Sequence, residues 1–407
     1  MQFSQFTLDA ALLRGITRLG FTKPTPIQAA ALPHALAGRD VLAAAMTGSG
    51  KTAAFALPAL QRTFAGPTGR TRVLILTPTR ELAAQVHEHL AAIGRETRVR
   101  IASVFGGVGA EPQARALRAG ATVVVATPGR LLDHLRSGAA RLDGVELLVL
   151  DEADRMLDMG FLPDVRRILA HLPARRQTLM FSATLPPPIV ELSRSLLSDP
   201  VRIGIERRAE PAKGVRQALL PVPEQRKPAL LLQLLSSNEV DTALVFTRTK
   251  HRADRLARFL DQSGISCDRI HGNRSQPQRQ SALAGFKAGK VRVLVATDIA
   301  ARGIDVRDLP HVVNFDVPVQ PDDYVHRVGR TARVEATGHA LTLVTPEDEP
   351  AVRAIERAIG ASIARRKVDG FNYSVPAAPT PSGASRPQAR RGPIARQPRR
   401  RSGRRAA

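Results

Sequence analysis

Two short stretches of this 407-residue chain combine residue types that could handle a nucleotide. The first is AMTGSGKT, in which Gly48 and Gly50 come directly before Lys51 and Thr52. Glycines in such a loop let backbone amides close around phosphate oxygens, while the lysine reaches the outer phosphates and the hydroxyl can ligate Mg²⁺. Ala45 stands where this pattern usually has its first glycine. A short strand before the stretch and the apolar helix AAFALPAL after it predict a phosphate-binding loop.

The second stretch, VELLVLDEADRMLD, runs from a buried apolar strand into three acids, Asp151, Glu152 and Asp154. Taken alone, Asp151 is best explained as the cap of the following helix, with the other acids near the positive helix end. A phosphate loop on the same carboxyl edge of a parallel sheet reverses that preference. Asp151 could then hold Mg²⁺ through water, and Glu152 could orient or deprotonate the water that attacks the γ-phosphate. The helix cap is the weaker alternative.

Composition limits the class of protein. A hydrophobic content of 43% with 24% charged residues is ordinary for a globular chain. The longest apolar runs are far shorter than a membrane span, and the beginning MQFSQFTLDA has no export signal. We therefore expect a soluble, cytoplasmic protein without a membrane partner. The single Cys267 excludes an intrachain disulfide and a cysteine-rich zinc site.

The charge of the chain indicates a polyanionic partner. Sixty basic residues against 36 acidic ones leave a net charge of +24, and residues 376–407 hold nine arginines and no acid. The rest of the chain stays strongly basic, which favours nucleic acid. A general compositional bias toward arginine would explain part of this excess. With no Trp and two Tyr there is little material for stacking bases, so we expect contacts to the sugar-phosphate backbone and poor sequence specificity.

Strand-like and helix-like segments alternate along the chain. The strand-like runs are DVLAAA, VLILTP, VRIASVF, TVVVATP, VELLVL and TLMFSA in the first half, and VRQALLPV, TALVFT, ISCDRIHG, VRVLVATD, HVVNFDVP and HALTLVT in the second. This alternation predicts two α/β domains with parallel sheets flanked by helices. We expect a first domain over 1–204, a linker over 205–214 and a second domain over 215–370. Residues 371–407, rich in Pro, Ser, Gly and Arg, should form a disordered tail.

Eight motifs together resemble one family. GFTKPTPIQ, AMTGSGKT, PTRELA, TPGR, DEAD, SAT, TDIAARGID and HRVGRTAR follow one another in the order found in DEAD-box ATP-dependent RNA helicases. The resemblance covers about residues 1–345, and the short beginning and basic tail are similar to the bacterial RhlE-like branch. It implies two tandem RecA-like domains, ATP and Mg²⁺ as cofactors, and RNA as partner. The implied activity is an RNA-dependent ATPase that binds, bends and locally unwinds RNA duplexes without base specificity.

The resemblance also assigns roles to single residues in the nucleotide site. Catalysis is implied for Lys51, Asp151, Glu152, Arg330 and Arg333, the last two as arginine fingers from the second domain. Cofactor binding is implied for Phe21, Lys23, Gln28, Ala45, Met46, Thr47, Gly48, Ser49, Gly50, Lys51, Thr52 and Asp305, with Thr52 and Asp151 at the metal and Phe3 as the aromatic before the adenine segment. Ala332 stands where the family usually has glycine, and a positive φ there would strain the finger loop.

Further roles concern coupling and RNA. Ser182, Thr184 and His326 are implied to couple hydrolysis to strand separation. The implied RNA contacts are Pro78, Thr79, Arg80, Gly106, Gly107, Thr127, Pro128, Gly129, Arg130, Thr247, Arg248, Gln276, Arg279, Thr297 and Asp298. Each motif also has a purely structural explanation when it is taken alone. GFTKPTPIQ could be a proline-rich loop, SAT a helix cap, the strand-end residues ordinary turns, and HRVGRTAR a solvated basic face. Small, hydroxyl and basic residues at strand ends suit phosphates and 2′-OH groups rather than bases.

Three other functions stay open from the sequence. The chain could clamp RNA or remodel RNA–protein complexes with little unwinding, which a strand-displacement assay would reveal. It could be a DNA-directed translocating helicase, although the DEAD and SAT motifs argue against this. It could be a nucleotide-switch protein without a nucleic-acid role, which would leave the basic tail unexplained. Ribosomal and RNA-decay assemblies are both possible settings by family analogy.

Overall fold

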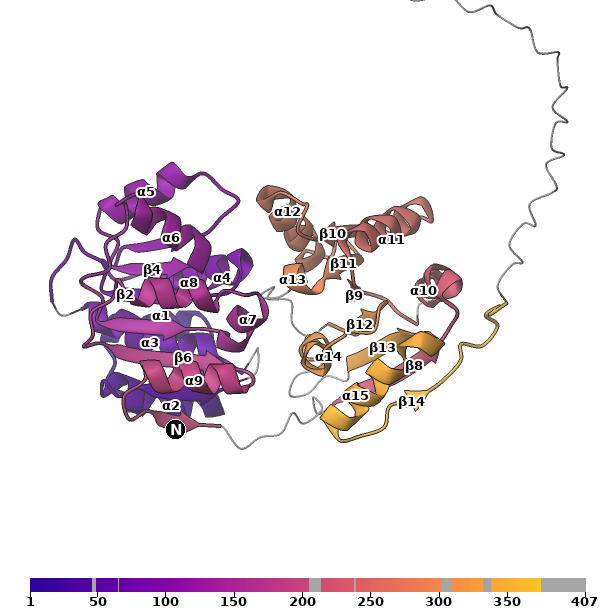
Figure 1. Ribbon diagram of the computed structural model, residues 1–407, viewed down its shortest axis with the longest axis horizontal. Helices are drawn as coiled ribbons and strands as arrows, with labels where there is room; N and C mark the ends of the chain where they lie inside the picture. The colour runs from indigo at the N-terminus through magenta and orange to yellow at the C-terminus, as the bar shows by residue number, and fades with distance from the viewer. Residues whose placement is uncertain are drawn as a thin grey trace, which may run out of the picture.

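The computed structural model describes residues 1–45, 49–64, 66–204, 214–237, 239–301, 309–331 and 338–374. The chain forms two lobes, each built on one seven-stranded sheet (Figure 1). Every strand pairing in the described residues is parallel, so each strand must return through a crossover, and helices provide it. This confirms the predicted α/β class.

The strand order of the first lobe is β3-β4-β2-β5-β6-β1-β7. Its strands are β1 (Val41–Ala44), β2 (Val73–Leu76), β3 (Ile101–Val104), β4 (Val123–Ala126), β5 (Leu147–Leu150), β6 (Gln177–Ser182) and β7 (Val201–Ile203). The second lobe has the order β10-β11-β9-β12-β13-β8-β14. Its strands are β8 (Val215–Pro221), β9 (Ala243–Thr247), β10 (Cys267–Ile270), β11 (Val293–Thr297), β12 (His311–Asn314), β13 (Gly338–Val344) and β14 (Ala364–Arg365).

Helices cover both faces of each sheet. Those of the first lobe are α1 (Ala10–Arg18), α2 (Pro26–Leu36), α3 (Lys51–Thr63), α4 (Arg80–Ile93), α5 (Ala110–Arg118), α6 (Pro128–Arg136), α7 (Ala153–Asp158), α8 (Leu162–Leu169) and α9 (Pro187–Leu196). Those of the second lobe are α10 (Lys227–Ser236), α11 (Lys250–Gln262), α12 (Gln276–Lys287), α13 (Asp298–Ala301), α14 (Pro321–Val328) and α15 (Glu349–Ile359). Short 3₁₀ turns are η1 (Phe3–Gln5), η2 (Glu224–Arg226) and η3 (Pro346–Asp348).

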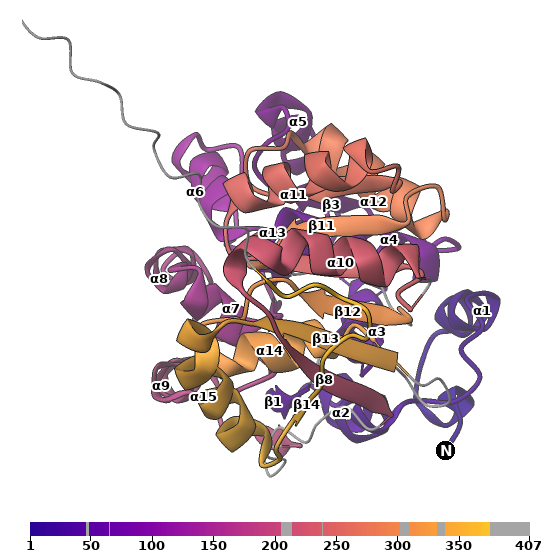
Figure 2. The ribbon, with the colours of Figure 1, turned by 90° about the vertical axis from the view of Figure 1, so that its right-hand side faces the viewer.

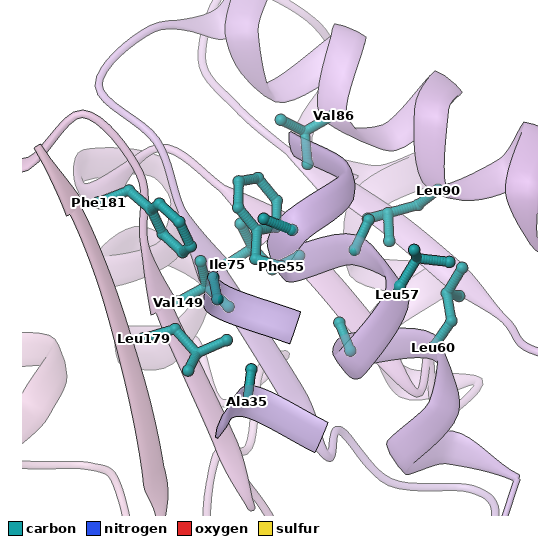
Figure 3. Packing of buried hydrophobic residues seen from close by; sticks show 14 of the residues in the cluster. Ala35, Phe55, Leu57, Leu60, Ile75, Val86, Leu90, Val149, Leu179 and Phe181 are labelled. Atoms are coloured by element: carbon teal, nitrogen blue, oxygen red, sulfur yellow. The ribbon is translucent and has the colours of Figure 1, made fainter. Parts of the chain in front are cut away.

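The core of the first lobe follows from the two-residue period of its strands. Alternate side chains point to opposite faces, so Ile75 and Val149 face α1–α4 while Leu74 and Leu148 face α5–α9. Figure 3 shows the first of these layers, where Phe181 of β6 lies against Phe55 of α3. Their ring centroids are 5.5 Å apart. Burial on both faces explains why these strands are almost continuously apolar.

The second lobe repeats this arrangement. Helices α10 and α11 cover one face of its sheet and lie in front of the strands in Figure 2. Helices α12 to α15 cover the opposite face. Figure 1 shows that α13 and α14 lie on the side of this lobe that faces α7 of the first lobe. The second sheet is thereby placed with α14 toward the acids that follow β5.

Two strands escape the sequence-based prediction, and both are edge strands. β7 pairs only with β1 and β14 only with β8 in the described residues, and their residues are half-buried or exposed. An edge strand of two or three residues has no long apolar run, so periodicity has nothing to detect. The other twelve strands coincide with the predicted runs.

The chain packs onto the second lobe up to the last described residues. Phe371 and Tyr373 lie against the core beneath α10, although the predicted tail begins at residue 371. The Arg226 guanidinium donates to the Asn372 carbonyl at 2.9 and 2.6 Å and lies 5.1 Å from the centre of the Phe371 ring. Residues 375–407 of the tail and 205–213 of the predicted linker lie outside the described residues. None of the described helices has the length and apolar character that crossing a membrane requires.

Candidate functional site

The carboxyl edge of the first sheet is divided into two halves. The predicted phosphate loop follows β1, the predicted acids Asp151 and Glu152 follow β5, and the predicted coupling residues Ser182 and Thr184 lie at the end of β6; these three strands are neighbours in the sheet. The predicted RNA residues follow β3, β4 and β2, which are also neighbours. Because β2 pairs with β5, the two halves meet at the strand that ends in Asp151. The fold alone therefore places both predicted sites side by side.

The described part of the phosphate loop is held by the segment before α2. Gly50 has φ +92, and a Cβ there would lie 2.6 Å from Nε2 of Gln28 and 2.8 Å from Oγ1 of Thr25. Nε2 of Gln28 donates to the Gly50 carbonyl at 2.9 Å, and its Oε1 accepts from the Thr25 amide at 2.9 Å. Only glycine fits this close approach with a positive φ. Ser49 precedes it and is half-buried, whereas Met46, Thr47 and Gly48 lie outside the described residues.

Lys51 lies between the two acids that follow β5. Its Nζ is 3.1 Å from Oδ1 of Asp151 and 3.4 Å from Oε1 of Glu152. All three side chains are at most 5% exposed. Ala45, buried at the end of β1, donates its amide to the Ser182 carbonyl and so fixes the loop against β6. The spacing of the motifs thus brings one cation and two carboxylates together in a water-poor site.

The pKa values of the neighbouring carboxyl groups of Asp151 and Glu152 are shifted in opposite directions. Burial raises the pKa of Asp151, and this outweighs the attraction of Lys51. Burial acts in the same direction on Glu152, but the charges of Lys51, Arg155 and Arg330 outweigh it and hold its pKa at about 2. Glu152 is therefore an anion throughout the neutral range. A carboxylate in that state can accept a proton or a hydrogen bond from water.

Asp151 has the character of a ligand for a divalent cation. Both of its carboxylate oxygens are buried; Oδ1 lies 3.1 Å from Nζ of Lys51, and Oδ2 has no hydrogen-bond partner within the described residues. Unsatisfied buried oxygens are costly unless a cation lies near them. Thr52, the second residue of α3, offers a hydroxyl beside Lys51. In the part of the chain that the structure describes, no three His, Cys, Asp or Glu side chains converge on a metal site, so a cation here would also need oxygens from a nucleotide.

Glu152 has an unusual backbone for a residue other than glycine. Its φ and ψ are both 54°, and it is the residue before α7. Left-handed backbone of this kind costs on the order of 1–3 kcal/mol and persists where the surroundings enforce it. Here the buried pairing with Lys51 and the hydrogen bonds of the following turn to the Glu152 carbonyl enforce it. The strain directs the carboxylate toward Lys51.

The predicted adenine segment packs onto α4. Phe21 is half-buried, with its ring 6.3 Å from Phe3 in a stacked arrangement and 5.7 Å from the His89 ring. Lys23 is exposed two residues later. Gln28 is only 4% exposed, and its amide groups bond to the protein as described above. The structure therefore brings Gln28 onto the phosphate loop, and it brings Phe3 onto Phe21.

Asp154 connects the strand ends of β5 and β6, a role that the sequence did not reveal. Its Oδ2 accepts from the amides of Ala183 and Thr184 at 3.1 and 2.8 Å and from the Thr184 hydroxyl at 3.0 Å. The Ser182 hydroxyl accepts from the Asp154 amide at 3.0 Å. Both predicted coupling residues of this lobe are thus bound to the acid that ends the DEAD motif. Three acids in four residues signalled chemistry but not this division of labour.

The second lobe reaches the acids through α14 and the residues after it. The Arg155 guanidinium bonds to Nδ1 of His326, which joins the two lobes. The charge of Arg330 helps to lower the pKa of Glu152, and the His326 imidazole also lies close enough to influence that carboxylate. Arg330 is buried, at 7% exposure. Arg333, Asp305 and Ala332 lie outside the described residues.

The predicted RNA residues of the first lobe form one surface. Pro78, Thr79 and Arg80 join β2 to α4, and the Thr79 hydroxyl accepts from the Leu82 amide at 3.2 Å as the helix cap. Thr127, Pro128, Gly129 and Arg130 join β4 to α6, and Arg130 donates to the Val108 carbonyl at 3.1 Å. Gly106 and Gly107 follow β3.

Glycine at position 107 leaves room for Arg80. A Cβ at Gly107, which has φ +82, would lie 1.9 Å from Nη1 of Arg80. At Gly106 the nearest Arg80 atom would be 3.4 Å away. The lack of a side chain at Gly107 therefore leaves space for the guanidinium of Arg80, the first residue of α4.

The predicted RNA residues of the second lobe have several protein partners. Thr247 and Arg248 follow β9, Thr297 ends β11, and Gln276 begins α12 and is buried. Arg279 forms an ion pair of 3.0 Å with Glu81, the second residue of α4 in the first lobe. Asp298 accepts from Nε and Nη2 of Arg327 at 2.6 and 2.7 Å.

Four functional candidates beyond the predicted set thus emerge: Glu81, Asp154, Arg155 and Arg327. Glu81 lies within PTRELA and Asp154 within DEAD, while Arg155 follows DEAD directly and Arg327 lies in HRVGRTAR. Position inside or next to a motif is a signal for each of them. Their partners are far away in the sequence, and three-dimensional contacts were needed to find them.

Comparisons with known proteins agree with this geometry. The family described as DEAD/DEAH box helicase matches residues 25–192, and the one described as helicase conserved C-terminal domain matches residues 226–335. Two curated relatives, both called DEAD-box ATP-dependent RNA helicase CshA, come from Geobacillus kaustophilus and Bacillus subtilis. They are 43% and 42% identical to this chain over 365 residues. The alignments cover 90% of this chain and 78% and 74% of the relatives.

Solved structures share the fold of both lobes. S. cerevisiae Dbp5 bound to RNA and ADP BeF3 is similar with a TM-score of 0.81 at 29% identity, over 90% of this chain and 96% of that one. A DEAD box protein from Methanococcus jannaschii gives 0.53 at 38% identity, over 90% and 99%. The DEAD box protein has the higher sequence identity but the lower TM-score. Over both lobes together, this chain superposes better on the Dbp5 complex than on the Methanococcus jannaschii protein.

Proposed function

This chain belongs to the DEAD-box RNA helicase family, and on that premise we propose that it hydrolyses ATP between its two lobes in order to bind, bend and locally unwind RNA. The observation that carries the proposal is that side chains from both lobes meet around Glu152. Lys51 and Glu152 come from the first lobe, and His326 and Arg330 approach from the second. An active site completed by both lobes is inactive when they are apart. Hydrolysis would therefore depend on whatever brings the lobes together.

In the proposed mechanism Glu152 takes the proton of the attacking water. Its low pKa keeps it ionised, and its position beside Lys51 is fixed by burial. Lys51 would bind the outer phosphates, and Arg330, with Arg333, would stabilise the charge that develops on the transferred group. Thr52 and Asp151 are the residues that would hold Mg²⁺, which would supply positive charge to the phosphate oxygens. Asp305 would contact the ribose.

The adenine contact is proposed for Phe21, Lys23 and Gln28. An amide that both donates and accepts is suited to the donor–acceptor edge of a purine base. Gln28 donates to the carbonyl of Gly50, the residue before α3. A base that replaced Gly50 as the acceptor of this hydrogen bond would release the start of α3. This supports a link between recognition of the base and position of the phosphate loop.

RNA would bind along the halves of the two sheet edges that carry β3-β4-β2 and β10-β11-β9. Arg80 and Arg130 of the first lobe and Arg248 of the second present guanidinium groups suited to phosphates. The glycines, threonines and backbone amides around them suit the 2′-OH. Because these groups read no base edge, we expect little sequence preference. A strand held by both lobes in this arrangement would be bent, and a straight duplex would lose a few base pairs.

Four further assignments stay predictions. These are the RhlE-like branch, the division into domains over 1–204 and 215–370, service in ribosomal or RNA-decay assemblies, and a cytoplasmic location. The relatives named above are called CshA, which does not support the branch. Fluorescence microscopy of a tagged chain and isolation of bound partners would test location and assembly.

The decisive experiment is steady-state ATPase activity with and without single-stranded RNA. We expect ATP turnover to rise at least about tenfold with RNA, because RNA and ATP together would draw the lobes into contact. Single-stranded DNA of the same sequence is the control, and it should stimulate much less. Turnover that is indifferent to RNA would contradict the proposal, and equal stimulation by DNA would contradict the choice of RNA. Displacement of a short duplex then separates unwinding from clamping.

A further inference from the structure

A buried lysine lies where a buried cation is least expected. Lys227 is the first residue of α10, and its side chain is 2% exposed. A cation at this position faces the positive end of a helix, and burial removes its hydration. Both effects oppose the charge, so the carboxylates around it must compensate. Those carboxylates are Glu224, Asp348 and Asp316, whose oxygens lie 3.3, 3.4 and 4.0 Å from Nζ at the carboxyl edge of the second sheet, near the predicted RNA residue Arg248.

Asp348 is the carboxylate that links Lys227 to Arg248. Its Oδ2 is 3.4 Å from Nζ of Lys227, and its Oδ1 is 3.4 Å from Nη2 of Arg248. Oδ2 also accepts from the amide and hydroxyl of Thr345 at 3.1 and 3.0 Å. Among the described residues, these two are the only cations within ion-pair distance of Asp348. The 3₁₀ turn η3, which ends at Asp348, fixes it beneath Arg248.

Asp348 is charged at neutral pH. Burial acts to raise its pKa, but the hydrogen bond from the Thr345 amide and the charge of Lys227 outweigh burial, so the pKa lies below its usual value. A charged carboxylate beside Arg248 competes with any phosphate for the guanidinium. The strength of that competition depends on how much of the carboxylate's charge Lys227 neutralises.

The backbone of Arg248 is held by another acid, Asp316, which is buried. Its amide donates to Oδ2 of Asp316 at 2.8 Å, and Oδ1 of Asp316 is 2.8 Å from Nη2 of Arg252 and 4.0 Å from Lys227. Asp316 therefore has its own cation in Arg252, whereas Asp348 depends on Lys227. The Arg248 side chain remains 53% exposed. Its backbone is fixed while its guanidinium stays open to solvent.

We propose that Lys227 is a positioning residue for RNA binding: it neutralises Asp348 from within the lobe, and this keeps the Arg248 guanidinium available to an RNA phosphate. The inference rests on the proposed function, because it assumes that Arg248 contacts RNA. Without Lys227, Arg248 would be the only cation left near the half-buried carboxylate of Asp348 and would be drawn onto it. Lys227 never touches RNA and acts through charge alone.

The first test is Lys227→Met, which keeps the length of the side chain and removes its charge. Affinity for a single-stranded RNA in the presence of a non-hydrolysable ATP analogue should fall about tenfold, the effect of losing one charge-assisted hydrogen bond. The RNA concentration for half-maximal ATPase should rise by a similar factor, while turnover at saturating RNA and KM for ATP stay within about twofold. Lys290→Met, on an exposed lysine of the same lobe, is the matched control.

The second test is Asp348→Asn, which removes the competing charge and changes the shape of the side chain little. RNA affinity should then increase about threefold, because phosphate no longer competes with a carboxylate. This variant also protects the test against misfolding of Lys227→Met, which thermal unfolding would reveal. If Asp348→Asn left RNA affinity unchanged or lowered it, the proposal would be overturned.

The third test repeats both substitutions in an Arg248→Gln background. If Lys227 acts through Arg248, neither substitution should change RNA affinity by more than about twofold there. A merely structural role would lower affinity by the same factor in both backgrounds and would overturn the proposal. If RNA stimulates the unaltered protein but Lys227→Met binds RNA normally, only this inference fails. If RNA does not stimulate the unaltered protein, the proposed function fails and the inference fails with it.

Discussion

Glu152 lies where charges from both lobes converge, so its substitution separates binding from chemistry. Glu152→Gln keeps the shape and removes the base, and ATP turnover with RNA should fall at least about 10²-fold. ATP-dependent binding of RNA should persist, because Lys51 and the lobe contacts remain. Multiple-turnover ATPase and RNA binding measured side by side check this. Glu191→Gln, exposed on α9, is the control, and undiminished turnover in Glu152→Gln would remove Glu152 from catalysis.

His326 makes contact between the lobes sensitive to pH. Burial first, and then the charge of Arg155, hold the pKa of His326 well below its usual 6.5, and Nδ1 must be unprotonated to accept from Arg155. When the lobes separate, the pKa returns toward 6.5, so the separated state binds the proton. Closure should therefore weaken as pH falls below 6.5, by about tenfold in its equilibrium constant for each pH unit.

Distance measurements by fluorescence transfer between labels on the two lobes, with an ATP analogue and RNA, check this from pH 7.5 to about 5.5. His326→Asn keeps an acceptor and does not titrate, so its closure should vary less with pH over this range. His251→Asn, on the exposed side of α11, should behave as the unaltered protein does. Closure with the same pH dependence in His326→Asn would assign the effect to another group.

At the scale of elements, the turn after β3 controls a residue after β2. Gly107→Ala would place a Cβ 1.9 Å from Nη1 of Arg80 at a φ of +82. The backbone strain costs about 1 kcal/mol, and the flexible end of Arg80 must move away. We expect RNA affinity to fall about tenfold, the worth of one charge-assisted contact, with turnover at saturating RNA largely kept.

Filter binding or fluorescence anisotropy with single-stranded RNA measures this effect. Gly109→Ala is the matched control, because its φ is −53 and its Cβ would meet only Pro112 at an ordinary 3.6 Å. Equal RNA affinity in Gly107→Ala and Gly109→Ala would show that RNA binding does not depend on the position of the Arg80 guanidinium beside Gly107.

Elements show which parts of this molecule can be predicted from the sequence. Strands buried on both faces are visible as apolar runs, and strand ends then locate the motifs on one edge. β7 and β14 remain hidden because a short edge strand needs no apolar pattern. The bonds of Gln28 to Thr25 and Gly50 and those of Asp154 to Ala183 and Thr184 were not predicted, because hydrogen-bond partners depend on which segments are neighbours in space. The β5–β6 pairing puts Asp154 beside Thr184, and no local rule contains that pairing.

Arg279 marks the limit of prediction by family likeness. It was expected to contact RNA, and the structure joins it to Glu81 across the lobes. A guanidinium that is 10% exposed and paired with a buried acid belongs to the contact between lobes in this arrangement. Whether it also binds RNA stays a prediction.

For the molecule as a whole, the Glu81–Arg279 ion pair should stabilise closure. When the lobes meet, Glu81→Gln leaves the Arg279 guanidinium without its ion-pair partner. Breaking a buried ion pair in this way costs about 3 kcal/mol or more. The fraction of closed molecules with an ATP analogue and RNA should fall, and more RNA should be needed to stimulate ATPase. Fluorescence transfer between the lobes and RNA titrations check this. Glu88→Gln, exposed on the same helix, is the control, and unchanged closure in Glu81→Gln would contradict the expectation.

The basic tail should act on affinity through charge. Removing residues 376–407 takes away nine arginines, so RNA binding should weaken and log K should fall less steeply with log salt, by about 0.7 for each lost phosphate contact on a single strand. Salt titrations of RNA affinity measure this slope. A full-length variant with the nine arginines changed to Gln separates charge from chain length. An unaltered slope after deletion would leave the tail with some other task.

The last described residues of the chain are fixed to the second lobe, because the Arg226 guanidinium donates to the Asn372 carbonyl. Arg226 is the residue directly before α10. An RNA strand bound by the arginines of residues 376–407 would be tethered to the second lobe only. When hydrolysis lets the two lobes separate, the RNA would leave the groove between them and would still be bound to the second lobe through those arginines. Successive rounds of local unwinding would then act on the same RNA molecule.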